Sequence, residues 1–289
     1  MSYNILRSNY INNGYIHLKD FFDKNLIEEV KSDSQLVFYN QFKRCNLTTK
    51  KIDEIEEDEF NELLFTFFET DLASYINCGK QIQHLISLHK LSLNDKVQKT
   101  LKDLGLQFPN ISTRPVTFLN HKKLSKAKVY HTVDSHQDWR SMQGSLNSIV
   151  IWVPLMDINK DLGALEILPK SHQNGLKSGH FDQGFGFVEL SKEEKKQLLT
   201  IEVKTGDALF FSSFLIHQSG ENKTNGPRWS SHFRFNDLYE KTFVNRGYPH
   251  PYIYKPDGKL ITENFPSISE IKSVFNVKNS HSTLKNNQL

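Results

Sequence analysis

The chain has 289 residues, of which 37% are hydrophobic, and its 36 Lys and Arg residues nearly balance its 33 Asp and Glu residues. This composition can fill a core, which excludes a fully disordered chain, and a formal charge of +3 is too small for the dense basic surface that nucleic-acid binding needs. The two cysteines, Cys45 and Cys78, cannot build a disulfide framework or a thiolate metal cage within one chain. Any bound metal must therefore be held by imidazole and carboxylate groups.

Membrane insertion and secretion are not expected from this sequence. No segment approaches the roughly 20 consecutive apolar residues that span a bilayer, and the first residues lack the apolar stretch of a secretory signal. We therefore expect a soluble cytoplasmic protein that acts on a small molecule and binds neither membranes nor nucleic acid.

The N-terminal part, about residues 14–108, is predicted to be mainly helical after one short strand at 14–18. Leu26, Ile27 and Val30 share one face of a helix that follows Asp23. Phe and Leu also recur at helical spacing over about 53–72 and 81–104. The acidic run at 53–62 is expected to lie on the solvent-exposed face of its helix.

After Pro109 the pattern changes to short β-branched and aromatic runs that are separated by Gly, Pro, Asn and Asp. This alternation is typical of a β-sandwich or barrel. Ser191 and Glu194 form a capping-box match, which predicts one helix inserted among the strands. The polar end of the chain, 276–289, has no periodicity and is predicted to be a flexible tail. The expected strands are 129–133, 148–155, 164–168, 201–203, 208–215 and 229–235.

Two His-x-Asp triplets occur, at His136 and at His180, which is no more than chance can produce in a chain with 12 histidines. His136 and Asp138 follow an extended run, and on a strand this spacing points both side chains to one face. A third ligand is expected from His217, at the end of the apolar strand that starts at Ala208. Two imidazoles and one carboxylate are the facial triad that suits non-haem Fe(II). The triplet at His180 lies among glycines and is expected to form an irregular loop.

Arg228 follows a segment rich in Gly and Asn, which predicts a hairpin that returns beside the strand carrying His217. Alternation in the strand after it places Arg228, Ser230, His232 and Arg234 on one side. A buried arginine needs an anionic partner, and a dicarboxylate bound to iron would supply one. The plainer alternatives are a rim arginine paired with a surface carboxylate, an ordinary turn histidine at 136 and a strand-end histidine at 217.

Several motifs, in order over residues 14–237, resemble the phytanoyl-CoA dioxygenase family of Fe(II)- and 2-oxoglutarate-dependent oxygenases. A departure from the family pattern is Lys170, which stands where the family usually has glycine. The matching motifs are His136-Gln137-Asp138, residues 149–158, 163–166 and 169–172, Gly206-Asp207, residues 217–222 and Arg228.

The resemblance implies a mainly β fold of the α+β kind, a double-stranded β-helix (jelly roll, cupin-like) with the N-terminal helices packed on one sheet. It implies one domain over residues 1–275, with its β-helix core at about 110–237. By the same resemblance the iron ligands are His136, Asp138 and His217. The residues expected at the cosubstrate are Arg228, Ser219, Trp152, Gln137 and Ser230, although a strand tryptophan is more often simply core.

The implied activity is hydroxylation of a C–H bond with Fe(II), 2-oxoglutarate and O2, and with release of succinate and CO2. A carboxylate at Asp138 favours oxygenation over the halogenation that related enzymes perform with a small residue there. Desaturation, cyclisation or epimerisation by the same oxidant, or a non-catalytic metal-binding cupin-like protein, remain alternatives. A small polar or anionic metabolite is the expected substrate, and its contacts are expected from Phe118, Tyr130, Trp139, Arg140, His232 and Arg234.

Arg140 could equally be a solvated loop residue, and Arg234 a structural ion-pair partner. The lysines at 122, 123, 126 and 128 could bind an anionic carrier, but a basic solvated loop is the favoured interpretation.

Overall fold

The structure is a computed structural model that describes residues 3–126, 133–182 and 185–250. Contacts group Met1–Pro251 into one compact unit. The predicted tail at 276–289, the predicted domain limit at residue 275 and most of the strand predicted at 129–133 lie outside the described residues.

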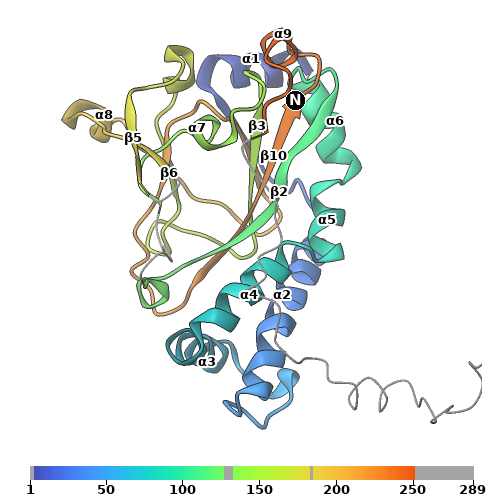
Figure 1. Ribbon diagram of the computed structural model, residues 1–289, viewed down its shortest axis with the longest axis vertical. Coiled ribbons are helices and arrows are strands. Elements are labelled where there is room, and N and C mark those ends of the chain that lie inside the picture. Colours follow the sequence, from blue (N-terminus) through green and yellow to red (C-terminus); the bar gives the residue numbers. More distant parts are fainter. Residues whose placement is uncertain (1–2, 127–132, 183–184, 251–289) are drawn as a thin grey trace, which may run out of the picture. The chain divides into compact units, whose positions relative to one another are not determined.

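A five-stranded antiparallel sheet, the major sheet, forms the centre of this unit (Figure 1). Its strand order is β1-β8-β3-β10-β2, so strands distant in sequence lie side by side. The strands are β1 (Tyr15–Leu18), β2 (Pro109–Asn120), β3 (Ile149–Pro154), β8 (Ala208–Ser212) and β10 (Arg228–Asp237).

A second, minor sheet has the order β7-β4-β9, and a separate hairpin pairs β5 with β6. His136 joins the two, because it forms one antiparallel bridge to Phe187 in β6 and another to His217 in β9. The strands are β4 (Leu165–Ile167), β5 (Gly179–Asp182), β6 (Phe185–Val188), β7 (Leu199–Ile201) and β9 (His217–Ser219).

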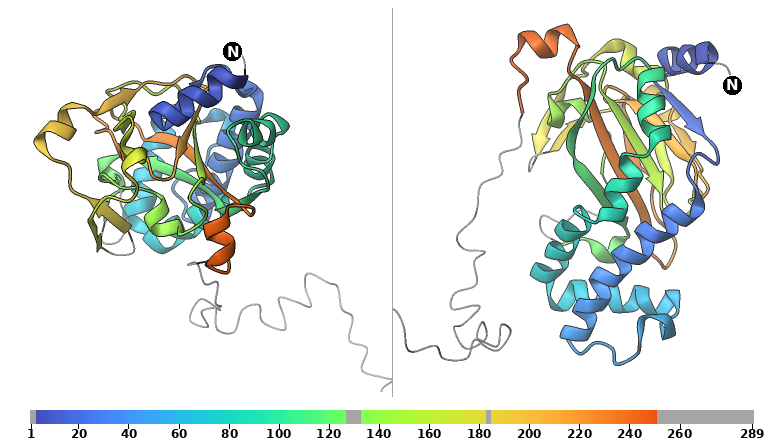
Figure 2. Two further views of the ribbon diagram at one scale, coloured as in Figure 1. Left: turned by 90° about the horizontal axis from the view of Figure 1, so that it is seen from above. Right: turned by 90° about the vertical axis from the view of Figure 1, so that its right-hand side faces the viewer.

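Helices cover one face of the major sheet, and α4, α5 and α6 contact β2 directly (Figure 1; Figure 2, right). The N-terminal helices are α1 (Tyr3–Asn13), α2 (Lys24–Arg44), α3 (Glu57–Thr70), α4 (Leu72–Ile82), α5 (Ile86–Ser92) and α6 (Asp95–Asp103). Short helices occur at α7 (Trp139–Met142), α8 (Lys192–Lys196) and α9 (Lys241–Asn245), with 3-10 turns at Ile52–Glu54, Lys122–Leu124 and Ser171–Asn174.

The two faces of the major sheet are buried against different partners, as alternation along the strands requires. Trp229 and Phe233 of β10 belong to the core shared with the helices. Trp152 of β3 and Leu209 of β8 belong to a second core, which also contains residues of the minor sheet. This is the predicted jelly roll, a double-stranded β-helix with helices on one sheet, although its two sheets do not close into a barrel among the described residues.

Several predicted elements differ from the observed ones. The helical stretch expected at 81–104 is divided among the end of α4, α5 and α6. The break between α5 and α6 lies at Asn94, whose side chain accepts a hydrogen bond from Lys96 N and starts α6. The strand expected at 201–203 lies at 199–201, and β2 and α1 were not predicted. The capping box at Ser191 is confirmed at the start of α8.

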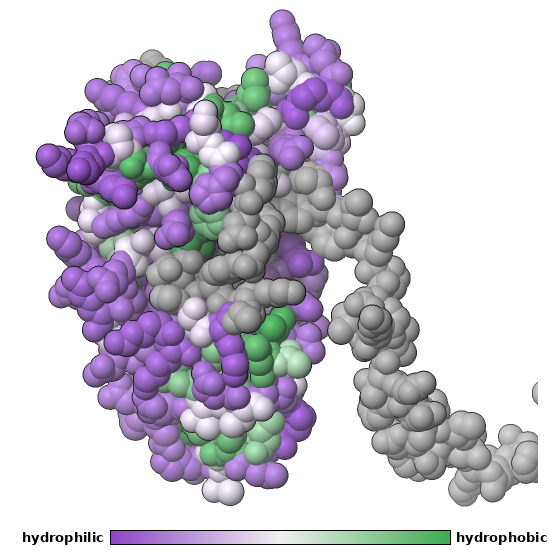
Figure 3. All heavy atoms as spheres, turned by 60° about the vertical axis from the view of Figure 1, so that its left-hand side comes forward, coloured by the Kyte–Doolittle hydropathy of each residue, from purple (hydrophilic) through white to green (hydrophobic). Residues whose placement is uncertain are grey.

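None of the described helices combines the length and the apolar character needed to cross a bilayer. The face shown in Figure 3 is mostly hydrophilic, with small hydrophobic groups between polar ones.

Replacing Phe42 by Ala should destabilise the helical layer. Phe42 is fully buried in α2, with its ring centroid 5.3 Å from that of Phe60 and 5.7 Å from that of Phe67. We expect the free energy of unfolding to fall by about 3–5 kcal/mol, measured by chemical denaturation. Leu36→Ala, at a side chain of the same helix that is 44% exposed, is the control and should change it by about 0.5 kcal/mol or less. Equal losses in both variants would contradict this assignment of the core.

Candidate metal centre

Three side chains from two segments that are distant in sequence converge at one place. One ligand atom from each of His136, Asp138 and His217 lies within 4.8 Å of the other two. His136 Nε2 and Asp138 Oδ1 are 3.4 Å apart. Asp138 and His217 are buried, and His136 is half-buried. The three groups that the sequence singles out thus lie close enough to share one ion.

Backbone pairing brings the two histidines together. His136 N donates to His217 O at 3.0 Å, and His217 N donates to His136 O at 3.1 Å. The local structure differs from the prediction in two ways. β8 ends at Ser212, and His217 begins β9 in the minor sheet instead of ending β8. Asp138 has helical backbone angles and starts α7, so it reaches the site from a turn after His136 rather than from a strand.

The histidine rings are oriented by backbone carbonyls. His136 Nδ1 lies 2.7 Å from Asp134 O, and His217 Nδ1 lies 3.0 Å from Leu215 O. A carbonyl oxygen can only accept a hydrogen bond, so both Nδ1 atoms must carry the proton. Each Nε2 is then left with a lone pair for a metal, an arrangement typical of histidine ligands.

The protonation states of the buried ligands also favour metal binding. Burial by itself would raise the pKa of Asp138, but the nearby Arg234 charge and the two histidines hold it well below its usual value. Burial, with a contribution from His136, lowers the pKa of His217 to about 3. At neutral pH the site therefore offers an anionic carboxylate and a neutral imidazole.

Arg228 of β10 is fully buried and has no ion-pair partner among the described residues. Its Nη1 donates to Gly163 O, its guanidinium carbon lies 5.7 Å from the centre of the Trp152 ring, and its Nε has no hydrogen-bond partner in the described part of the chain. Burial alone lowers its pKa to about 10, so no carboxylate of the described residues compensates the charge. The alternative of a rim arginine paired with a surface carboxylate is wrong.

The loop before Arg228 is not a hairpin to β9. β9 pairs with β4, whereas β10 pairs with β2 and β3, so the connection crosses from the minor to the major sheet. Gly163, at φ +80°, lets the chain pass close to Gly220, because a Cβ at Gly163 would lie 2.7 Å from Gly220 O. The Asn222 side chain stabilises this connection, because its amide donates hydrogen bonds to Asn120 O and Gly226 O.

Further buried polar atoms beside Arg228 also have no partner among the described residues. They are Trp152 Nε1, Ser230 Oγ, His232 Nε2 and Asn120 Oδ1. Ser230 and His232 follow Arg228 on the same face of β10, and Asn120 lies directly opposite Arg228 on β2. Asn120 was not predicted, because no sequence signal marked β2 as a strand next to β10. Buried polar groups without partners indicate a place where a polar molecule binds.

Two residues predicted at the cosubstrate are bonded to the backbone. Ser219 Oγ accepts from Val133 N at 3.2 Å, and its side chain lies on the same side of β9 as His217. The Gln137 amide donates to Gly175 O and Phe214 O and accepts from Lys177 N. Gln137 therefore fixes the loops around the site, and the prediction that its side chain contacts the cosubstrate is not supported by this geometry.

The residues predicted to contact the substrate do not form one cluster in the structure. Phe118 and His232 face each other, with ring centroids 6.3 Å apart, and burial together with the Arg234 charge holds the pKa of His232 well below its usual value. Trp139 stacks on Phe214 and donates from its indole nitrogen to Gly144 O.

The two arginines of this set differ in what they contact. Arg140 donates to Lys177 O. Its side chain packs directly against Gly186, where a Cβ would clash with the Arg140 side chain. Arg234 donates to Asp138, one of the three candidate ligands. Tyr130 and Lys128 lie outside the described residues.

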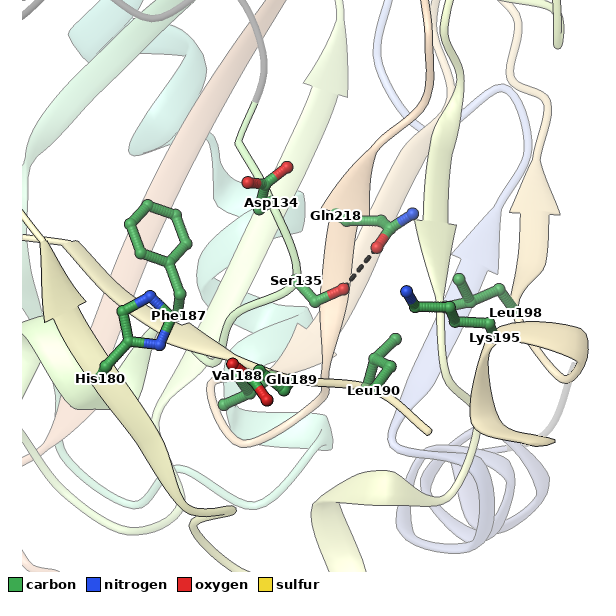
Figure 4. A pocket seen from close by; sticks show the side chains of 10 residues that line it. All are labelled: Asp134, Ser135, His180, Phe187, Val188, Glu189, Leu190, Lys195, Leu198 and Gln218. Atoms are coloured by element: carbon green, nitrogen blue, oxygen red, sulfur yellow. Dashed lines mark hydrogen bonds between the residues drawn. The ribbon is translucent and has the colours of Figure 1, made fainter. Parts of the chain in front are cut away.

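The second triplet belongs to a strand. His180 lies in β5 and pairs with Phe187 of β6, so the expected irregular loop is wrong. His180 and Phe187 also line an open groove of about 810 Å³, at whose floor Ser135 donates to Gln218 (Figure 4). Ser135 and Gln218 are sequence neighbours of His136 and His217 and face away from them.

Comparisons with known proteins agree with this geometry. The sequence profile of the phytanoyl-CoA dioxygenase (PhyH) family matches residues 10–230. Phytanoyl-CoA dioxygenase 1 of Oryza sativa subsp. japonica is 28% identical over 240 residues, which cover 73% of this chain and 80% of the rice protein. The human peroxisomal phytanoyl-CoA dioxygenase is 29% identical over 141 residues, 45% of this chain, and the match spans only 41% of the human protein.

Solved structures share the fold at low identity. The epimerase SnoN, solved with Fe3+, alpha ketoglutarate and nogalamycin RO, aligns with a TM-score of 0.56 and 16% identity over 81% of this chain and 83% of that one. EctD from S. alaskensis, solved with 2-oxoglutarate and 5-hydroxyectoine, aligns with a TM-score of 0.51 and 15% identity over 83% and 77% of the two chains.

The metal-free protein should lose stability in acid because His217 is buried in its neutral form. The usual pKa of 6.5 applies to the unfolded chain and a pKa of about 3 to the folded one, so between these values only the unfolded chain takes up the proton. The variant His217→Gln cannot take up this proton, so it lacks this loss of stability in acid. As the pH falls from 6.5, the unfolding free energy of the wild type should decline relative to the variant by up to about 1.4 kcal/mol per pH unit.

Urea denaturation in the presence of a chelator, from pH 7 to pH 5, measures this difference. The same substitution at the exposed His84 is the control. Parallel curves for the wild type and His217→Gln would show that His217 is not held neutral by burial.

Proposed function

This chain belongs to the phytanoyl-CoA dioxygenase family, and on that basis we propose that it is an Fe(II)- and 2-oxoglutarate-dependent dioxygenase that hydroxylates a C–H bond of a small metabolite. Membership of the family and the ligand atoms of the site support the metal and the cosubstrate. Its substrate class comes from the residues around that site.

His136, Asp138 and His217 would hold the iron. Two Nε2 atoms with free lone pairs and one ionised carboxylate fit Fe(II), and such a triad leaves adjacent coordination positions for other ligands. Bound iron and 2-oxoglutarate together supply the oxidation of the substrate by O2, with release of succinate and CO2. The protein contributes the ligand geometry and excludes water from the inner face.

The observation that carries the proposal is the buried charge of Arg228, which no carboxylate of the described residues compensates. A guanidinium that is 1% exposed is costly without an anion, and the distal carboxylate of 2-oxoglutarate would supply one. Ser230 Oγ and Trp152 Nε1, which have no partner among the described residues, lie on the same inner face and could donate to the same ligand. A site that only stored metal would have no use for this arrangement, which argues against a non-catalytic cupin-like protein.

His232 and Phe118 are the residues we propose at the substrate. His232 is kept neutral by burial, and its buried Nε2 has no partner among the described residues. This nitrogen can therefore form one hydrogen bond with a polar group of the substrate. Phe118 supplies an apolar wall beside it. Epimerisation remains a second outcome of the same oxidation, because the structurally similar SnoN is an epimerase.

Asp138→Ala should abolish succinate formation. The variant loses the anionic ligand, so metal affinity and 2-oxoglutarate turnover should fall by at least about 100-fold, measured by elemental analysis and by succinate release. Asp134→Ala is the matched control, since Asp134 orients His136 through its backbone oxygen and not through its side chain. Succinate release by Asp138→Ala at the wild-type rate would refute the ligand assignment.

Arg228→Met should weaken 2-oxoglutarate binding and leave metal binding intact. Loss of a charge-assisted, desolvated pair should raise the dissociation constant of 2-oxoglutarate by about 100-fold, measured calorimetrically on metal-loaded protein without O2. Arg228→Lys should give an intermediate value, because lysine keeps the charge but not the planar fork. If 2-oxoglutarate binds equally well to all three proteins, Arg228 is not its partner.

A further inference from the structure

The two oxygens of Asp138 have different neighbours. Oδ1 lies 3.4 Å from His136 Nε2, on the side where the candidate ligand atoms gather. Oδ2 accepts a hydrogen bond from Arg234 Nε at 2.9 Å. Both side chains are largely removed from solvent, at 4% exposure for Asp138 and 17% for Arg234. One oxygen is therefore directed to the metal position, and the other is bound by protein.

The strand β2, which pairs with β10 on one side, is irregular next to Arg234. Along β3 the pairing is continuous, with Arg234 opposite Val150. Along β2 the register shifts both before and after Arg234, between His232 and Arg234 and again between Arg234 and Phe235. Each shift adds a residue to β2, so β10 itself stays regular, and alternation points Arg234 to the same side as His232, where it reaches Asp138.

Coordination chemistry gives this contact a consequence. With one oxygen from Asp138 and one nitrogen from each histidine, an octahedral ion keeps three adjacent positions open. A chelating 2-oxoglutarate takes two of them and leaves one for O2. If Asp138 bound the ion through both oxygens, no position would remain for O2.

We propose that Arg234 is a positioning residue that reserves Oδ2 of Asp138, so that Asp138 binds iron through Oδ1 alone. This inference rests on the proposed function, because it matters only for a metal that must also bind 2-oxoglutarate and O2. It replaces the expectation that Arg234 binds an anionic substrate. The planar guanidinium suits this task, because its Nε–H fixes the direction of the hydrogen bond as well as the charge.

The test uses Co(II) as the probe, because its visible absorption spectrum reports coordination number, and the full-length protein with Arg234→Met and Arg234→Lys. We expect Arg234→Met to weaken Co(II) binding by about 10- to 100-fold and to change the Co(II) spectrum. Loss of a residue that hydrogen-bonds to a metal ligand typically has an effect of this size. The Co(II)-loaded variant should also bind 2-oxoglutarate more weakly than the Co(II)-loaded wild type does. Arg234→Lys should recover part of the affinity but not the wild-type spectrum.

Arg246→Met is the matched control. Arg246 also donates from its guanidinium, but to the backbone carbonyls of Gln143, Gly144 and Thr242 and not to a metal ligand. Its Co(II) affinity should stay within about twofold of the wild type, with an unchanged spectrum. Thermal unfolding of each variant checks folding, and Arg234→Lys carries the test if Arg234→Met does not fold.

The outcomes separate this inference from the proposed function. If wild-type protein binds Co(II) and 2-oxoglutarate, and both Arg234 variants keep the wild-type affinity and spectrum, Arg234 does not position Asp138 and only this inference fails. If the wild type itself binds no Co(II), or binds it without accepting 2-oxoglutarate, the proposed function fails first. A loss in Arg246→Met as large as in Arg234→Met would show a general loss of structure and would also overturn the inference.

Discussion

The pair of backbone hydrogen bonds between His136 and His217 is the contact on which the site depends. It joins two segments about 80 residues apart in the sequence and sets both imidazoles on one side of the minor sheet. The carbonyls of Asp134 and Leu215 then fix the ring tautomers, and the turn into α7 adds Asp138. Each ligand is thus positioned by the backbone, which is more rigid than a contact between two side chains.

The inner face of β10 concentrates charge and polarity in a buried place. Arg228, Ser230, His232 and Arg234 follow one another on this face, whereas the opposite face of the same strand packs against the helices. Burying so many polar groups costs stability unless each finds a partner. Arg234 forms an ion pair with Asp138, whereas Arg228 contacts a backbone carbonyl and the Trp152 ring but no carboxylate among the described residues. This imbalance is the physical reason to place a small dianion beside the metal centre.

Sequence reasoning identified the local chemistry better than the path of the chain. The period of two in β10 correctly separated its polar face from Trp229 and Phe233, because alternation is a property of the strand itself. The position of His217 at the start of β9, and the partners of β10, depend on which strands pair across the two sheets, which no local pattern encodes. Asn120 and the Asp138–Arg234 contact were missed for the same reason, because each joins residues that are distant in sequence.

The central claim is that one ion and one dicarboxylate share this inner face, and the most direct measurement is a crystal structure of the protein soaked anaerobically with Fe(II) and 2-oxoglutarate. Anomalous scattering at the iron edge locates the metal. Our account predicts iron bound by His136, Asp138 and His217, with the chelated cosubstrate extending its far carboxylate to Arg228. Iron bound elsewhere, or a cosubstrate whose far carboxylate does not reach Arg228, would contradict it.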